Sequence, residues 1–201
     1  MLNYYGLIAT NIFLAYFFIM ILAFLPKKYK FIITLILIAI SNLIPIVNNL
    51  TIAELAFGYI GYLSLCSTLF ILIIITSKLY SKQAVIFSYT CLAFLIMCII
   101  FYGCFFISSY KLYDIGFSAY IVLLFIFSYG IILLLISNKF IVFNTILLIA
   151  TLASFSNLLQ MNIWNYIIDP ILVIICLIEL ISALIILVKN KKENIAEIKY
   201  F

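Results

Sequence analysis

The sequence predicts an all-α, polytopic membrane protein with seven transmembrane helices, the N-terminus outside and the C-terminus in the cytoplasm. Three observations predict this fold class: the composition, the long apolar runs and the distribution of lysines. Of the 201 residues, 69% are hydrophobic and only 8% are charged, with a mean hydropathy of +1.41. Soluble chains are roughly 45–50% apolar and about 25% charged. This composition therefore excludes a water-soluble globular domain, and it also excludes a disordered chain.

Seven apolar runs follow one another along the chain, separated by short polar segments. A helix needs about 20 residues to cross the hydrocarbon layer, and it satisfies its own backbone amides there. The runs are Gly6–Leu25, Phe31–Val47, Leu55–Thr76, Val85–Ile107, Phe117–Ile136, Phe140–Leu158 and Ile171–Val188. We expect a single membrane domain, with a four-helix part at 1–116 and a three-helix part with a short cytoplasmic tail at 117–201.

Prolines and small residues divide and shape these runs. Pro26 opens an expected turn of sequence Lys-Lys-Tyr-Lys, and Pro170, directly after Asp169, favours the N-terminal position of the last helix. In the second run, Asn42 and Pro45 predict a kink with a polar contact between helices. The third run carries small residues at spacings of about three, which predict one closely packed helix; they are Gly58, Gly61, Ser64, Ser67 and Thr68.

The lysines gather in alternate connections and thereby predict the orientation. Ten lie on one predicted side, at positions 27, 28, 30, 78, 82, 139, 189, 191, 192 and 199, whereas the other side has only Lys111. Glu54, Asp114 and Asp169 lie on that second side. Basic residues stay in the cytoplasm. A bacterial inner membrane is the expected location, with the mitochondrial inner membrane as the alternative.

The residue inventory excludes several kinds of chemistry. The chain has no histidine, and all eleven basic residues are lysines, so His-based metal sites and bidentate arginine recognition are absent. Its five cysteines lie in apolar runs without a ligand-like spacing, as buried hydrophobic cysteines do. We expect no catalytic residue, no cofactor, no bound metal and no nucleic-acid partner. Aromatic residues near the outer ends predict an interfacial belt; they are Tyr4, Tyr5, Tyr110, Tyr113, Trp164 and Tyr166.

Glu179 is the main candidate for a functional residue. It lies midway along the last apolar run, in the sequence ILVIICLIELISALIILV. A charged side chain at the bilayer centre costs about 2.5–3.5 kcal/mol on insertion scales, and such residues usually have a function. The membrane interior favours the protonated acid, so Glu179 could take up and release a proton. The alternative is a protonated acid that only joins two helices through a hydrogen bond.

Polar residues of the sixth and seventh runs are the candidates for lining a proton path. Such side chains hold ordered water, or they join helices through hydrogen bonds. The sequence leaves both interpretations open. The residues are Asn144, Thr151, Ser154, Asn157 and Ser182.

The last three runs resemble subunit K of NADH-quinone oxidoreductase. The resemblance rests on SYGIILLLISNKFIVFNTILLIATLASFSNLL and on DPILVIICLIELISALIILVKNKKENIAEIKYF, in which Glu179 precedes Ser182, Ala183 and a lysine-rich tail. The whole chain resembles component E of hydrogenase-4, a seven-helix relative of that subunit. Two features depart from the family. No acid lies in the middle of the sixth run, near Leu148 or Thr151, and ENIAEIKYF replaces a glycine-rich end.

The resemblance implies a non-catalytic membrane subunit of a respiratory-type oxidoreductase, a membrane-bound hydrogenase or an NADH dehydrogenase-like complex. Glu179 would contribute to proton translocation or coupling. The implied partners are antiporter-like membrane subunits and a peripheral redox module, within the lipid bilayer. Two alternatives remain: a small stand-alone proton-coupled transporter, and a membrane scaffold or interaction protein. The lack of arginine, paired charges and Gly/Pro-interrupted helices disfavours a carrier of polar substrates.

Overall fold

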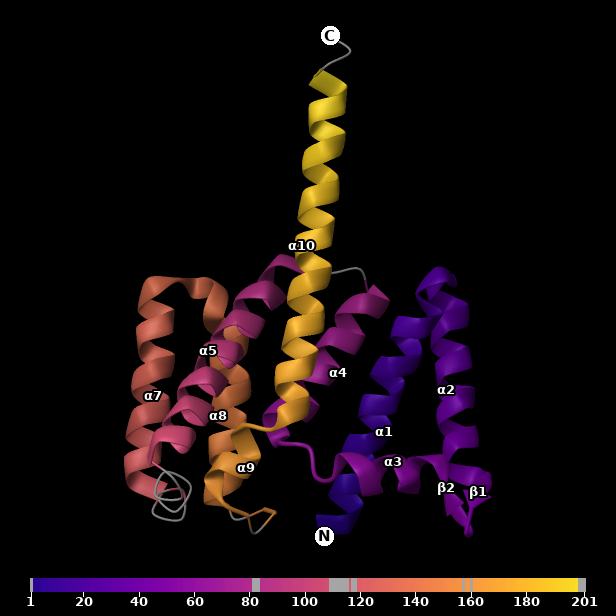
Figure 1. Ribbon diagram of the computed structural model, residues 1–201, viewed down its shortest axis with the longest axis horizontal. Helices are drawn as coiled ribbons and strands as arrows, with labels where there is room; N and C mark the ends of the chain where they lie inside the picture. Colours follow the sequence, from indigo (N-terminus) through magenta and orange to yellow (C-terminus); the bar gives the residue numbers. More distant parts are fainter. Residues whose placement is uncertain are drawn as a thin grey trace. The chain divides into compact units, whose positions relative to one another are not determined.

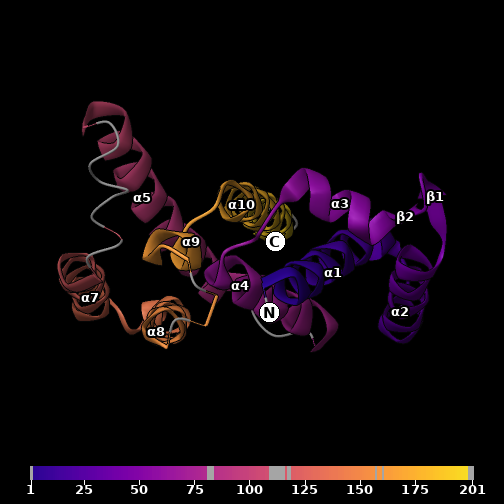
Figure 2. The ribbon, with the colours of Figure 1, turned by 90° about the horizontal axis from the view of Figure 1, so that it is seen from below.

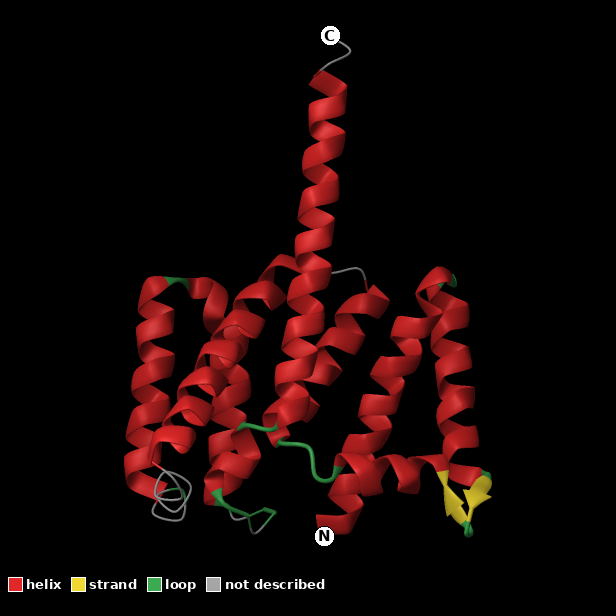
Figure 3. Ribbon diagram, viewed as in Figure 1, coloured by secondary structure: helices red, strands yellow, loops and turns green. Residues whose placement is uncertain are grey.

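A computed structural model describes residues 2–80, 84–108, 116, 119–156, 158–159 and 161–198. Within these ranges the chain is mainly helical, as the sequence predicts, and it also contains two short strands that the all-α prediction did not include (Figure 1, Figure 3). It forms two compact units that do not follow chain order. The first contains residues 1–82 and 146–171, and the second contains residues 83–145 and 172–201.

The first unit begins with α1, followed by a short 3-10 turn, and contains the only β-hairpin among the described residues. Its elements are α1 (Leu2–Ile21), η1 (Leu22–Phe24), α2 (Lys27–Leu43), β1 (Pro45–Val47), β2 (Leu50–Thr51), α3 (Ile52–Ile60), α4 (Leu65–Tyr80) and α9 (Ile163–Ile167). The second unit contains α5 (Ala84–Ser108), α7 (Ala119–Ile136) and η2 (Asn138–Phe140). Two helices run through both units: α8 (Ile141–Phe155) and α10 (Pro170–Ile198).

Several helices are apolar and long enough to cross a membrane. Three segments meet the length and composition for this, namely Tyr4–Phe24, Asn138–Phe155 and Ile163–Val188. Three more apolar helices are shorter: Leu65–Leu79, Ser88–Cys104 and Val122–Ile136. These helices are compatible with a membrane protein. Seven crossings, the orientation and the choice of membrane stay predictions.

Side-chain contacts fix the directions of three helices in the first unit. Tyr5 of α1 bonds to the start of α4, and Lys78 near the end of α4 reaches Met20 near the end of α1, so these two helices run parallel. Asn11 of α1 bonds to Asn42 of α2, the helix that follows a short turn, so α2 runs antiparallel to α1. The lysines of α2 and α4 consequently lie at one end of this unit.

The third apolar run is not one helix, and the prediction of a continuous span at 55–76 was wrong. The chain leaves the α-helix at Gly61, which has φ +73° and ψ −155°, and it is non-helical to residue 64 before α4 begins. A residue with a Cβ strongly disfavours such a conformation. The small residues after Gly61 therefore belong to a helix break and a polar cluster. They do not form a helix-packing motif.

The second run is also shorter than expected, because α2 ends at Leu43 and a hairpin follows. Its turn residues, Asn48 and Asn49, have φ +49° and +65°. Two left-handed residues form the type I′ turn that suits tight hairpins. The Lys-Lys-Tyr-Lys segment is not a turn but the first turn of α2, with Pro26 as its N-cap.

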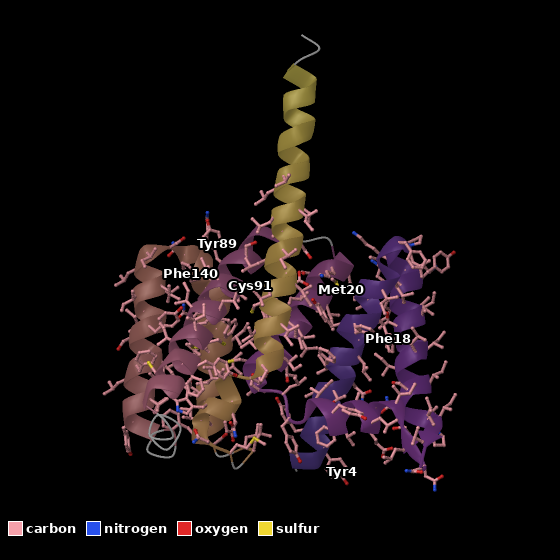
Figure 4. All side chains as sticks on the ribbon, in the orientation of Figure 1. Tyr4, Phe18, Met20, Tyr89, Cys91 and Phe140 are labelled. Carbon is pink, nitrogen blue, oxygen red and sulfur yellow. The ribbon has the colours of Figure 1, made fainter. Side chains whose placement is uncertain are left out.

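Aromatic rings form the core of the second unit. The ring of Phe143 packs edge-on against Phe94 at 4.8 Å and against Tyr129 at 5.7 Å. The Tyr129 hydroxyl donates to the carbonyl of Ala93 at 2.8 Å. Nearer η2, which contains Lys139, the ring of Tyr89 packs edge-on against Phe140 at 5.6 Å. Both side chains are labelled in Figure 4. These contacts hold α5, α7 and the start of α8 together.

Candidate functional site

A buried polar cluster surrounds Asp169 in the first unit. The carboxylate Oδ2 accepts a hydrogen bond from the backbone N–H of Ser64 at 2.6 Å, and a short one from the Ser67 hydroxyl. Asp169, Ser64 and Ser67 are all buried. Ser64 directly precedes α4 and Ser67 lies in its first turn, so both donors are at a helix N-terminus, which carries partial positive charge. The cluster thus stabilises a carboxylate by N–H and O–H donors.

The two serines form a directed chain of hydrogen bonds toward the acid. The Ser67 hydroxyl donates to Asp169, so its 2.8 Å contact with the Ser64 hydroxyl is one that Ser64 donates. The Ser64 oxygen also accepts from the backbone N–H of Ser67 at 3.1 Å, and thereby caps α4. The helix cap and the acid are therefore parts of one network.

Tyr5 brings α1 into the same cluster. Its hydroxyl lies 3.0 Å from the Leu63 carbonyl and 3.0 Å from the Thr68 hydroxyl. Thr68 in turn donates to the Ser64 carbonyl at 3.0 Å. Residues far apart in the sequence thus satisfy the backbone groups that the non-helical segment 61–64 leaves open.

The segment before Asp169 is folded into the unit rather than exposed. Asn162 caps α9 through the N–H of Trp164, and the Tyr166 hydroxyl accepts from the N–H of Leu159 at 2.7 Å. Trp164 and Tyr166 are buried, with 4% and 0% exposure. Their assignment to an interfacial belt was wrong, because they anchor this segment, and α9 packs against α4. Tyr4, by contrast, is 76% exposed, as a belt residue would be.

Two interruptions of apolar segments meet at this cluster. One lies between α3 and α4 at Gly61, and the other separates α9 from α10 just before Pro170. Interrupted membrane helices often place unwound backbone and helix ends around a binding site. The sequence argument that no Gly- or Pro-interrupted helix is present was therefore wrong.

Glu179 lies in the second unit, on the covered side of α10. Leu172, Ile175 and Cys176 are fully buried, and Glu179 follows them at the spacing that keeps side chains on one helix face. Glu179 and Leu180 are half-buried, whereas Ile178 before them and Ile181 after them are exposed. The acid therefore lies on the less exposed face of α10, one turn after the last buried residues of that face.

The predicted lining residues make hydrogen bonds within their own helices. Asn144 donates to the Phe140 carbonyl, and Thr151, Ser154 and Ser182 donate to carbonyls three or four residues earlier. Asn144, Glu179 and Ser182 belong to the second unit, and Thr151 and Ser154 to the first. Asn157 lies outside the described residues. A shared proton path through these residues stays a prediction.

Sequence analysis missed the Asp169 cluster and treated Asp169 only as a marker of the outer side. Two local signals could have found it: an Asp-Pro pair at the start of a long apolar run, and two serines, Ser64 and Ser67, that follow Gly61 at spacings of three residues. Within the described residues, no group of three or more His, Cys, Asp or Glu side chains could hold a metal. No protein-family model, curated protein or solved structure matches the chain.

Proposed function

We propose that this protein is a non-catalytic membrane subunit of a respiratory-type redox complex, in which Glu179 takes up and releases protons. The observation that carries the proposal is the position of Glu179 on the less exposed face of α10, in line with Leu172 and Cys176. Acids inside membranes face the interior of a helix bundle or a hydrated cavity, and they mark proton and ion paths. An acid without such a role would be expected near the end of a helix, where its charge could reach water.

The segment of α10 that follows Glu179 supports a role as a subunit. Large apolar side chains are exposed in this chain at positions 184 to 188, all around the helix. Glu179 lies on the less exposed face, five to nine residues before them. A helix that is apolar on all sides suits burial among other membrane helices or lipid. Partner helices would complete the surroundings of the acid.

Purification in a mild detergent through a C-terminal tag tests the subunit proposal. Mass spectrometry of the eluate should identify antiporter-like membrane subunits together with iron–sulfur or nickel–iron proteins. A protein that elutes alone, or only with itself, would contradict the proposal.

Substitution of Glu179 tests the proton role. In vesicles that contain the purified complex and a pH-sensitive dye, Glu179→Gln should slow proton movement at least about tenfold while the complex still assembles. Glu54→Gln is the matched control, because Glu54 is exposed and outside the apolar spans, and glutamine can replace glutamate in its capping box. Unchanged proton movement would contradict the relay. Loss of assembly in Glu179→Gln alone would favour a scaffold role.

A proton-coupled carrier is the second candidate, favoured by the meeting of two interrupted segments at Asp169. Vesicles that contain this protein alone, with the same dye inside, should then respond to an imposed gradient of sodium, potassium or a small amine. Asp169→Asn should abolish the response, whereas Ser156→Ala should keep it, because Ser156 is exposed and bonds only within its helix. No response from the wild-type protein to any gradient would reject this candidate for those ions.

A further inference from the structure

The hairpin of residues 44–51 is apolar and uncovered in the described structure. Every residue from Ile44 to Leu50 is exposed, and the segment has no charged side chain. Its large exposed side chains are Ile44, Ile46, Val47 and Leu50. Only the two turn residues are polar amides. An exposed apolar segment of this kind is typical of a contact with a membrane or with another protein.

The paired asparagines give the depth of this hairpin relative to α1. Asn42 and Asn11 exchange two hydrogen bonds, of 2.7 Å and 3.2 Å, and so lie at the same level. Beyond that level, α1 continues for seven residues to Tyr4, about 10 Å at 1.5 Å per residue. Helix α2 continues for only one residue, to Leu43.

The hairpin extends from the end of α2 to the level at which the longer helix α1 begins. Helix α2 has 17 residues and is therefore about 25 Å long, shorter than a hydrocarbon layer of about 30 Å. The three residues of β1 extend the chain by about 10 Å. The Asn48–Asn49 turn thereby reaches the level of Tyr4, at the end of the unit where Figure 1 and Figure 4 place the N-terminus and Tyr4.

Helix α3 lies at the same level, across the end of α1 (Figure 1, Figure 2). Gly6 permits this contact: a Cβ there would overlap the ring of Phe57 and approach Tyr62 to 3.0 Å. Tyr59 on the other side of α3 is 92% exposed. A nine-residue helix is too short to cross a bilayer. The hairpin and α3 together form a layer at one end of the unit.

The charges of this unit identify which end that is. The described lysines of α2 and α4 lie at the opposite end, and Glu54 and Asp169 lie at the hairpin end. In the orientation that the lysines predict, with the basic residues in the cytoplasm, the hairpin end belongs to the outer leaflet. Open strand edges do not occur among acyl chains, whereas hydrated headgroups can satisfy their N–H and C=O groups.

We propose that the hairpin is an interfacial lipid-binding element of the outer leaflet. Ile46, Val47 and Leu50 lie against the upper part of the acyl chains, and the Asn48–Asn49 turn lies among the phospholipid headgroups. Tyr59 of α3 and Tyr4 of α1 occupy the same layer, where amphipathic aromatic side chains are stabilised. This role is independent of any proton chemistry at Glu179.

Quenching of tryptophan fluorescence by brominated phospholipids tests the proposal in the full-length protein. Val47→Trp places a probe on the hairpin, and Leu35→Trp, at an exposed position midway along α2, is the matched control. The buried Trp164 is retained, and its signal in the parent protein is subtracted. Val47→Trp should be quenched most by lipids brominated near the headgroup, and Leu35→Trp most by lipids brominated near the acyl-chain ends.

Three results would overturn the proposal. Emission typical of water, with no quenching by any brominated lipid, would place the hairpin in solvent. Blue-shifted emission without lipid quenching would show that a protein surface covers it, from a partner or a second copy. A depth profile equal to that of Leu35→Trp would place it among the acyl chains. If Val47→Trp does not elute as a folded protein, Ile46→Trp provides the same test from the neighbouring position.

Discussion

The two acids of the last apolar segment occupy contrasting environments. Asp169 lies where the helix is interrupted, and groups from a distant part of the chain donate hydrogen bonds to it. Glu179, ten residues later, lies inside the continuous helix α10 on its covered face. In a continuous helix every backbone N–H is already used, so an acid depends on other side chains. An interruption supplies free backbone donors, and this is where the chain holds a carboxylate firmly.

This contrast indicates different roles for the two acids. A carboxylate that accepts short hydrogen bonds at a helix N-terminus stabilises the fold, because those donors otherwise remain unsatisfied in an apolar interior. An acid on a continuous helix contributes little to local backbone structure, so its substitution should change the stability less. We therefore expect substitutions at Asp169 to affect stability most and substitutions at Glu179 to affect proton movement most.

Removal of the Asp169 carboxylate should have the largest effect on stability. Asp169→Ala leaves the N–H of Ser64 and the hydroxyl of Ser67 without this acceptor in a buried site, and should destabilise the first unit by roughly 3 kcal/mol. Unfolding in detergent, followed by the fluorescence of Trp164 in the same unit, measures this. Asp169→Asn should lose less, because its amide oxygen can still accept. Equal stability of Asp169→Ala and wild type would show that the cluster is not structural.

The conformation of Gly61 should matter nearly as much. Gly61→Ala forces a side chain into φ +73° and ψ −155°, at a cost of about 1–3 kcal/mol. Gly58 is the matched control, because it lies within α3 with open space around it. Gly58→Ala should leave stability unchanged or raise it by up to about 1 kcal/mol. If both variants unfold at the same denaturant concentration, the break at Gly61 does not require glycine.

The Asn11–Asn42 pair tests how continuous helices use polar groups. Each amide also donates to a carbonyl of its own helix, to Leu7 and Ile38 respectively. Asn42→Leu should therefore cost only about 1 kcal/mol, the usual strength of hydrogen bonds between membrane helices. The double variant Asn11→Leu with Asn42→Leu should cost less than the sum of the single changes, as a double-mutant cycle would show. Strict additivity would mean that the pair contributes no coupling.

Sequence patterns predicted the helical class because apolar composition determines it almost alone, and Asn42 was correctly expected to contact another helix. They failed where the backbone departs from a regular helix. Gly61 and the serines after it resemble a small-residue packing motif, and only the conformation shows that Gly61 ends a helix. The Asp-Pro pair marked Asp169 as unusual, but its hydrogen-bond donors could not be identified, because they lie more than one hundred positions earlier in the chain. The local pattern of apolar residues gives no information about pairs of residues so far apart in the chain.

The smallest expected effect concerns Glu54, an acid that is fully exposed rather than buried. Hydrogen bonds from the N–H and hydroxyl of Thr51 hold the pKa of Glu54 below its ordinary value of 4.5. A lowered pKa in the folded state means that the ionised carboxylate stabilises the start of α3 above the ordinary pKa, and that this stabilisation is lost as the pH falls through the folded value. The carboxyl chemical shift of Glu54, measured by NMR across that pH range, should report a pKa below that of Glu54 in the unfolded chain. Thr51→Val removes the hydroxyl donor and should raise the pKa of Glu54 partway back, while the backbone bond remains. An unshifted titration in the wild-type protein would show that the capping box does not persist, and that α3 begins without it.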